Sequence, residues 1–334
     1  MKNSTEARAI TDSAVLIALT FVIMLVGNFL GFTLLMTAIA FIPLALIYIK
    51  HDLKWWACGS IVSTALFSLF TGIINGIVSA IPVVILSFAY GYSIKKNRSG
   101  GNTLCMLMIG SLISLIISIC IYIYMILGIS ITTFIQRYII DLYKPMMTES
   151  AKLLGGKPEY INQINQINSF LTIKNILIIM PTILIIYAFI MALISIIIAN
   201  NTLKRLNFKV NQVDSFSKWY IHPIVALILV IGSIFGVILA QNGLNIGNSI
   251  IFSSMMLLFV IYSIEGLSLI YFLIEKNTSF GNSKSIPVIL VIFMIFAGSI
   301  GVLFMGILGI VDLLMDTRDI NKNSLMKMIK QKFE

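Results

Sequence analysis

A single acidic residue lies at the end of the longest uncharged stretch of the chain. Glu265 follows Trp219–Ile264, which contains no Asp, Glu, Lys or Arg, and precedes the apolar stretch Gly266–Ile274. An ionised carboxyl group at that depth of a bilayer costs roughly 3 kcal/mol unless it is neutralised, paired or hydrated. Glu265 could therefore bind a cationic group, carry a proton or join two helices by a hydrogen bond. The pattern leaves functional and structural roles open.

A second group of ionisable residues follows the last apolar segment. Asp312 and Asp316 are four residues apart and share one face of a helix, with Arg318 close behind them. The group could dock a partner, bind a cation or form an ion-pair latch. Because surface ion pairs are individually weak, we favour a solvated helix end. The candidate ligand- or ion-binding residues of the chain are Glu265, Asp312, Asp316 and Arg318.

Two pairs of small residues have the spacing that lets helices approach closely. They are Ala14 with Ala18 and Gly72 with Gly76. Such pairs mostly pack a helical bundle internally, and a partner interface is the less common alternative. We therefore treat these four residues as candidates for helix packing or partner contact.

The sequence lacks the common catalytic and phosphate-binding motifs. It contains no Gly-rich Lys-Ser/Thr loop, HExxH, GxSxG or acidic metal cluster, and its three cysteines lack metal-ligand spacing. We expect no catalytic residue, metal or cofactor, and we expect that the protein is not an enzyme. An ATP-driven process would need a separate ATPase subunit.

The elements that must position these residues are apolar helices. Hydrophobic residues make up 59% of the chain and charged residues only 11%, whereas soluble domains average about 45–50% and 25%. A bilayer span needs about 20 apolar residues. The uncharged segments lack period-2 alternation, which predicts an all-α, polytopic transmembrane helical bundle with about 8–10 spans. These segments are Ser13–Ile49, Trp55–Ile94, Ser99–Gln136, Asn175–Leu203, Trp219–Ile264 and Ser285–Val311.

The net charge of +10 reflects the membrane topology of the chain and does not indicate a nucleic-acid partner. Lys and Arg gather at the amino terminus and in alternate short connections, while the intervening turns near Gly27–Gly31, Gly72–Gly76 and Gln241–Gly247 carry none. Under the positive-inside rule this pattern places the amino terminus in the cytoplasm. We expect a multi-pass protein of the bacterial cytoplasmic membrane that contacts the lipid bilayer and no nucleic acid.

The order of apolar and polar segments predicts four regions. An amino-terminal five-helix membrane half covers residues 1–136, and an extracytoplasmic loop with an amphipathic helix covers 137–174. A carboxyl-terminal membrane half covers 175–316, and a basic cytoplasmic tail covers 317–334. Isoleucines spaced three apart at 161, 164 and 167 indicate the amphipathic helix.

The side of the carboxyl terminus depends on the number of spans. Nine single spans would export the basic tail, although its charge favours the cytoplasm. Glycines could break the last apolar block into two short helices and restore an even number of crossings. They are Gly298, Gly301, Gly306 and Gly309.

Three stretches of the chain resemble the YybS-like family of predicted bacterial multi-pass membrane proteins. They are Ser217–Pro223, Tyr262–Leu267 and Leu308–Arg318. The resemblance implies a polytopic architecture over nearly the whole chain and no assigned activity. Glu265 stands where the family is expected to have a neutral glutamine.

The first half is also similar to the substrate-binding subunits of energy-coupling-factor transporters. The similarity rests on Thr11–Leu19, in which Ala14 and Ala18 match an Ala-x-x-x-Ala ridge. It implies that this ridge packs on a membrane coupling subunit, which an ATPase energises.

Together these patterns favour a solute-binding or permease-like transport subunit without its own ATPase. The alternative is a non-transporting membrane scaffold for envelope or developmental machinery.

Overall fold

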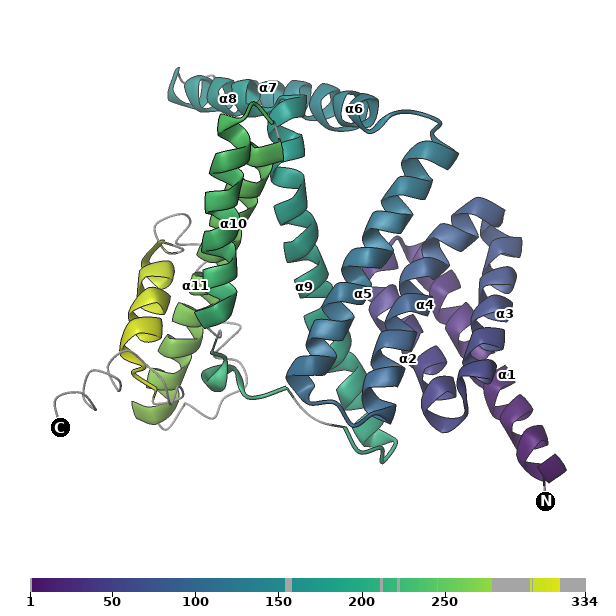
Figure 1. Ribbon diagram of the computed structural model, residues 1–334. Helices are drawn as coiled ribbons and strands as arrows, with labels where there is room; N and C mark the ends of the chain where they lie inside the picture. Colours follow the sequence, from purple (N-terminus) through teal and green to yellow (C-terminus); the bar gives the residue numbers. More distant parts are fainter. Residues whose placement is uncertain are drawn as a thin grey trace, which may run out of the picture. The chain divides into compact units, whose positions relative to one another are not determined.

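The computed structural model describes residues 2–153, 158–210, 213–220, 223–244, 246–277, 301 and 303–318. Within these ranges the chain is helical and forms no strand. Among the described residues, eight helices are long and apolar enough to cross a membrane. The predicted all-α polytopic bundle is therefore confirmed (Figure 1).

The eight candidate spans lie close to the expected apolar segments. They are α1 (Lys2–Leu30), α2 (Thr33–Lys50), α3 (Leu53–Thr71), α4 (Ile73–Lys95), α5 (Gly100–Ile121, continued by a π-helical turn over Tyr122–Ile126), α9 (Ile173–Arg205), α10 (Pro223–Gln241) and α11 (Ile246–Asn277). Shorter elements are α6 (Ile131–Phe134), a π-helical turn (Ile135–Ile140), α7 (Asp141–Leu153), α8 (Pro158–Phe170) and a 3₁₀ turn (Phe216–Lys218). A further apolar helix, here called the C-terminal helix, covers Leu303–Met315.

Contacts divide the chain into two compact units. Unit 1 contains residues 1–176 and 183–213, and unit 2 contains 177–182 and 214–334. This division differs from the predicted membrane halves because most of α9 packs with the amino-terminal helices. A buried hydrogen bond from the Tyr90 hydroxyl to Asn200 Oδ1, 2.8 Å long, joins α4 to α9 within unit 1.

Unit 1 is built from antiparallel helices joined by tight turns. Gly31 and Gly72 adopt positive φ values of 73° and 87°, which permit the uncharged turns after α1 and α3. α2 packs against α1, α3 and α4, and α4 also packs against α5. Large side chains fill the core between these helices and α9, including Phe41, Tyr90 and Ile196.

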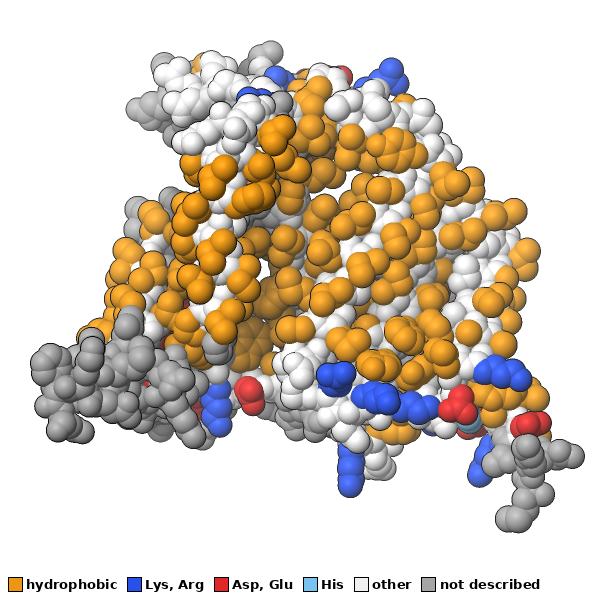
Figure 2. All heavy atoms as spheres, viewed as in Figure 1, with side chains coloured by type: hydrophobic (Ala, Val, Ile, Leu, Met, Phe, Trp, Pro, Cys, Tyr) orange, Lys and Arg blue, Asp and Glu red, His pale blue; other side chains and the backbone are white. Residues whose placement is uncertain are grey.

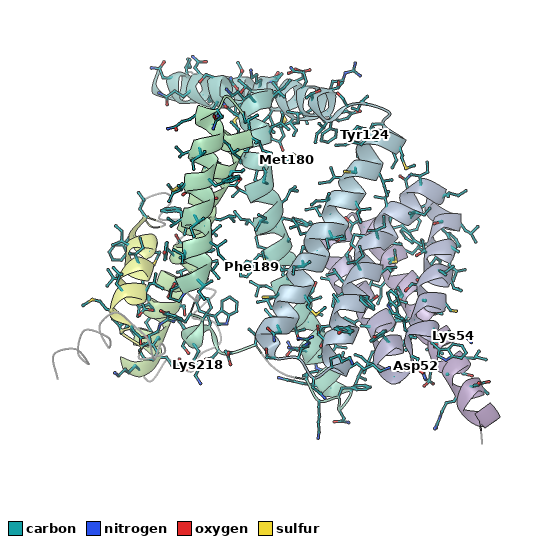
Figure 3. The ribbon with its side chains drawn as sticks, viewed as in Figure 1. Asp52, Lys54, Tyr124, Met180, Phe189 and Lys218 are labelled. Carbon is teal, nitrogen blue, oxygen red and sulfur yellow. The ribbon has the colours of Figure 1, made fainter. Side chains whose placement is uncertain are left out.

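Lys and Arg side chains gather at the end of unit 1 where α1 begins, here called the basic end. Figure 2 shows them there below flanks covered by hydrophobic side chains, and it shows further Lys and Arg side chains over the short helices at the opposite end. Asp52 and Lys54 lie at this end, and Tyr124 lies near the opposite end (Figure 3). Lys95 Nζ donates to Asp52 Oδ1 at 3.1 Å and joins two of the basic connections. The side of the membrane that this end faces stays a prediction.

Short helices follow α5 in the region predicted as an outer loop. α6, α7 and α8 run crosswise to α5 in unit 1 (Figure 1). α8 contains the predicted isoleucine stripe, in which Ile161 and Ile167 are exposed. This segment is therefore helical and leaves apolar side chains uncovered by the described residues.

Unit 2 is held by backbone contact between α11 and the C-terminal helix. Gly266 lies against the backbone of Met305 and Gly309, and Gly309 lies against Tyr262. Gly306 faces Phe259. Gly306 also lies near Ser263, and Gly309 lies near Gly266, so the two helices run parallel.

The glycines of the C-terminal helix have a different role from the predicted one. Leu303–Met315 is continuous through Gly306 and Gly309, so the expectation that these two residues break it is wrong. They are contact positions, where the absence of a side chain lets the helix backbones approach. Gly298 lies outside the described residues.

Candidate functional site

The end of the C-terminal helix brings Arg318 back against its own last turn. Asp316 follows the helix with φ of 48°, a left-handed conformation that aspartate tolerates better than most residues. Its N–H donates to the carbonyl oxygen of Asp312 at 2.7 Å. The reversal lets the Thr317 hydroxyl donate to Asp312 Oδ1. Thus a local backbone turn positions Arg318.

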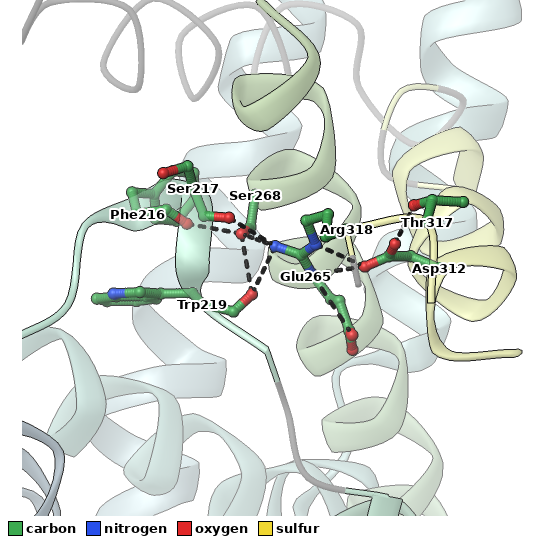
Figure 4. Close-up of polar contacts among 8 residues, drawn as sticks. All are labelled: Phe216, Ser217, Trp219, Glu265, Ser268, Asp312, Thr317 and Arg318. Atoms are coloured by element: carbon green, nitrogen blue, oxygen red, sulfur yellow. Dashed lines mark hydrogen bonds and ion pairs between the residues drawn. The ribbon is translucent and has the colours of Figure 1, made fainter. Parts of the chain in front are cut away.

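The Arg318 guanidinium is surrounded by acceptors (Figure 4). Nε and one terminal nitrogen lie 2.8 and 2.6 Å from the same carboxylate oxygen, Oδ2 of Asp312. The other terminal nitrogen donates to the Ser268 hydroxyl at 2.6 Å. It also donates to the carbonyl oxygens of Ser217 at 3.1 Å and Trp219 at 2.9 Å. One side chain therefore links the C-terminal helix, α11 and the segment before α10.

Glu265 completes this charged group from α11. Its Oε1 atom lies 3.7 Å from a terminal nitrogen of Arg318, and both side chains are fully buried. The distance is that of an ion pair without a close hydrogen bond. One guanidinium thus faces carboxylates from two helices and supplies the counter-charge that a buried carboxylate requires. We call Glu265, Ser268, Asp312 and Arg318 the arginine network.

The structure brings together three of the four predicted ligand- or ion-binding residues. Glu265 and Asp312 both contact Arg318, and Asp316 supplies the turn between Asp312 and Arg318. The favoured interpretation of Asp312 and Asp316 as a solvated helix end is wrong, because these residues are only 0% and 7% exposed. Folding back of Arg318 makes burial of Asp312 tolerable. A ligand or ion at this network stays a prediction.

The predicted small-residue pairs have unlike surroundings. Ala14 and Ala18 are exposed on α1 within unit 1. Gly72 forms the turn between α3 and α4, whereas Gly76 packs closely against Ser68 of α3. Only Gly76 is thus placed by the structure in a helix contact. A partner at Ala14 and Ala18 stays a prediction.

Unit 1 contains a cavity that the sequence analysis did not identify. Its volume is about 250 Å³, and its walls come from α2, α4, α5 and α9. Seven of its thirteen lining residues carry hydroxyl groups and none is charged. The hydroxyl-bearing residues are Thr33, Thr37, Ser79, Ser111, Ser114, Ser118 and Tyr187. We call this space the hydroxyl cavity.

The cavity lies toward the end of unit 1 that has uncharged turns. Thr33 is the first residue of α2, close to the turn at Gly31, and Val78 is near the start of α4. In the predicted topology this is the extracytoplasmic end. Ser111, Ser114 and Ser118 share one face of α5, since their spacing of three and four residues follows the helical repeat. That periodic hydroxyl pattern could have indicated the cavity from the sequence.

Ser111 has unused hydrogen-bonding capacity beside the cavity. Its side chain lines the space, is 3% exposed as a residue and finds no hydrogen-bond partner for Oγ among the residues that the structure describes. A buried hydroxyl without a partner costs about 1–3 kcal/mol. A bound solute or water in the cavity would offset that cost.

Comparison with known proteins gives a family but no activity. Residues 18–313 match the family described as "Predicted membrane protein (DUF2232)". The chain belongs to this family. No curated protein and no solved structure matches it. The DUF2232 match includes every residue of the hydroxyl cavity together with Glu265 and Asp312, and it ends before Arg318.

Proposed function

We propose that this DUF2232 protein is a solute-binding, permease-like subunit and that the hydroxyl cavity of unit 1 is its binding site. The cavity is the observation that supports the proposal most directly. It lies among four candidate membrane spans and combines hydroxyl groups with apolar walls. Small-molecule sites in proteins likewise combine apolar walls with polar groups that orient the solute.

We assign a binding role rather than a catalytic one to this cavity. Its hydroxyl groups are weak nucleophiles unless a neighbouring base activates them. None of the thirteen lining residues is His, Lys, Asp or Glu. The arginine network has a different part in the proposal: it anchors the C-terminal helix of unit 2 because Arg318 contacts three separate segments.

The proposed setting is the bacterial cytoplasmic membrane with the amino terminus inside. The basic end of unit 1 then faces the cytoplasm, and the hydroxyl cavity lies toward the outer surface. ATP-driven transport would need a separate ATPase subunit, since the chain has no phosphate-binding loop. A membrane coupling subunit and an ATPase are the partners that we propose for that case.

A cavity-filling substitution tests the proposal. Leu115 lines the cavity on α5, and its neighbour Ile116 is 44% exposed on the same helix. We expect Leu115→Trp to abolish retention of a small molecule by the purified protein and to lower solute uptake at least tenfold. The control Ile116→Trp should preserve both. Native mass spectrometry of the two variants measures retention.

The same preparations discriminate between the two functions. Recovery of an ATPase and a coupling subunit, together with a retained solute, would support transport. Recovery with envelope-synthesis proteins, without solute and with no effect of Leu115→Trp, would refute the proposal and favour the scaffold.

A further inference from the structure

The hydroxyl cavity also restricts the chemical class of its solute. No charged side chain lines it. A charged solute would therefore lose its hydration without gaining a counter-charge, which is strongly unfavourable in an apolar surrounding. An uncharged solute avoids this cost. The absence of charge from the walls thus favours neutral molecules.

Several hydroxyl groups around the cavity already donate their hydrogen atom to a backbone carbonyl oxygen. Thr37 Oγ1 donates to the carbonyl oxygen of Thr33 at 2.7 Å, and Ser114 Oγ donates to that of Ser111 at 2.9 Å. Ser118 Oγ donates to the carbonyl oxygen of Val78 at 3.3 Å. Each hydroxyl has one hydrogen but two lone pairs. These three groups can therefore only accept hydrogen bonds from a solute.

The remaining hydroxyl groups can adapt to either role. Ser111 Oγ is buried without a partner, and the hydroxyl groups of Thr33, Ser79 and Tyr187 likewise have no hydrogen bond to the other described residues. A hydroxyl group that is free to rotate can both donate and accept. The cavity therefore contains three hydroxyl groups that can only accept a hydrogen bond from a solute and none that can only donate one. The lining as a whole is matched best by a solute that donates hydrogen bonds.

Apolar side chains form the other part of the walls. Leu34, Pro82, Leu86 and Met191 belong to three different helices and line the same space. We infer that the cavity takes a small uncharged solute with one apolar face and an edge of hydrogen-bond donors, an inference that rests on the solute-binding function proposed above. Amides and hydroxylated ring compounds belong to this class, whereas carboxylates and organic cations do not.

Three probes of similar shape test the class on the purified full-length protein. Benzamide carries N–H donors, N,N-dimethylbenzamide carries none, and benzoate carries a negative charge. Ligand affinity is obtained from the rise of the melting temperature with probe concentration, because binding to the folded state alone stabilises it. We expect benzamide to bind at least tenfold more tightly than either of the other two probes.

Single hydroxyl deletions locate the binding. We expect Ser111→Ala to weaken benzamide binding about 2- to 10-fold, the value of one hydrogen bond. Its melting temperature without probe should stay equal or rise, since the variant removes a buried hydroxyl that has no partner. Ser195→Ala is the matched control, because Ser195 Oγ is also buried without a partner among the described residues but does not line the cavity. It should leave benzamide affinity unchanged.

Specific outcomes would overturn the solute class. Benzoate binding as tightly as benzamide, equal binding of the dimethyl compound, or no binding of benzamide at millimolar concentrations would each contradict it. Equal effects of Ser111→Ala and Ser195→Ala on affinity would contradict the location. Retention of a charged molecule that Leu115→Trp abolishes would leave the proposed function intact and refute only its solute class. No retained solute and no binding of any probe would refute both.

Discussion

The two units of this protein place polar groups among apolar helices in different ways. In unit 1 the polar groups around the hydroxyl cavity are uncharged, and Ser111 has unused hydrogen-bonding capacity. In unit 2 the arginine network is charged, and Arg318 is paired with carboxylates of its own chain. Charges paired within the protein hold helices together, whereas a neutral hydroxyl group without a partner beside a cavity can bind a solute.

The arginine network should show the largest effect on stability. Replacing Arg318 by Met leaves the buried carboxylates of Asp312 and Glu265 without their counter-charge. We expect a loss of about 3–5 kcal/mol, typical of a broken buried ion pair. Chemical unfolding in detergent micelles measures it. The control Arg205→Met concerns an exposed residue at the end of α9 and should change stability little. Equal effects of the two substitutions would show that the network is not an anchor.

The two carboxylates of the network should contribute unequally to the free energy of unfolding. Asp312 contacts two guanidinium nitrogens at 2.6 and 2.8 Å, whereas Glu265 lies 3.7 Å away. We expect Asp312→Asn to lower the free energy of unfolding by about 2–3 kcal/mol, since it weakens charge-assisted hydrogen bonds. Glu265→Gln should cost less in the same unfolding measurement. A larger loss from Glu265→Gln would give Glu265 the dominant role and contradict this ranking.

A single neutral hydrogen bond in unit 1 should have a smaller effect. Tyr90→Phe removes the donor to Asn200 Oδ1 and leaves that buried acceptor without its bond to α4. We expect a loss of about 1–2 kcal/mol. Tyr92→Phe provides a control two residues along α4, where the ring stacks on Phe88 and should continue to do so. Thermal unfolding of both variants measures the difference, and an equal response would remove the proposed link between α4 and α9.

The sequence predicted the spans well because long apolar segments have few stable alternatives in a bilayer. It also singled out Glu265, since a carboxylate among apolar residues is conspicuous. The partnership of Asp312 and Arg318 was harder to foresee. On a continuous helix, residues six apart point roughly 120° away from each other. Their contact depends on the left-handed turn at Asp316, which no local pattern required.

The hydroxyl cavity escaped prediction for another reason. Ser and Thr are ordinary residues of membrane helices, where their hydroxyl groups often bond to the preceding turn, as that of Thr37 does. Only the packing of α2, α4, α5 and α9 shows which of these groups share one space. Helix periodicity could have indicated the hydroxyl face of α5 but not the helices opposite to it.

The most direct test of the account compares one substitution in each unit for retention of the endogenous solute. Native mass spectrometry of the purified wild-type protein, Leu115→Trp and Glu265→Gln measures this property. We predict that the wild type and Glu265→Gln retain the same small uncharged molecule and that Leu115→Trp loses it. Retention by Leu115→Trp together with loss in Glu265→Gln would place the binding site in unit 2 and contradict the account.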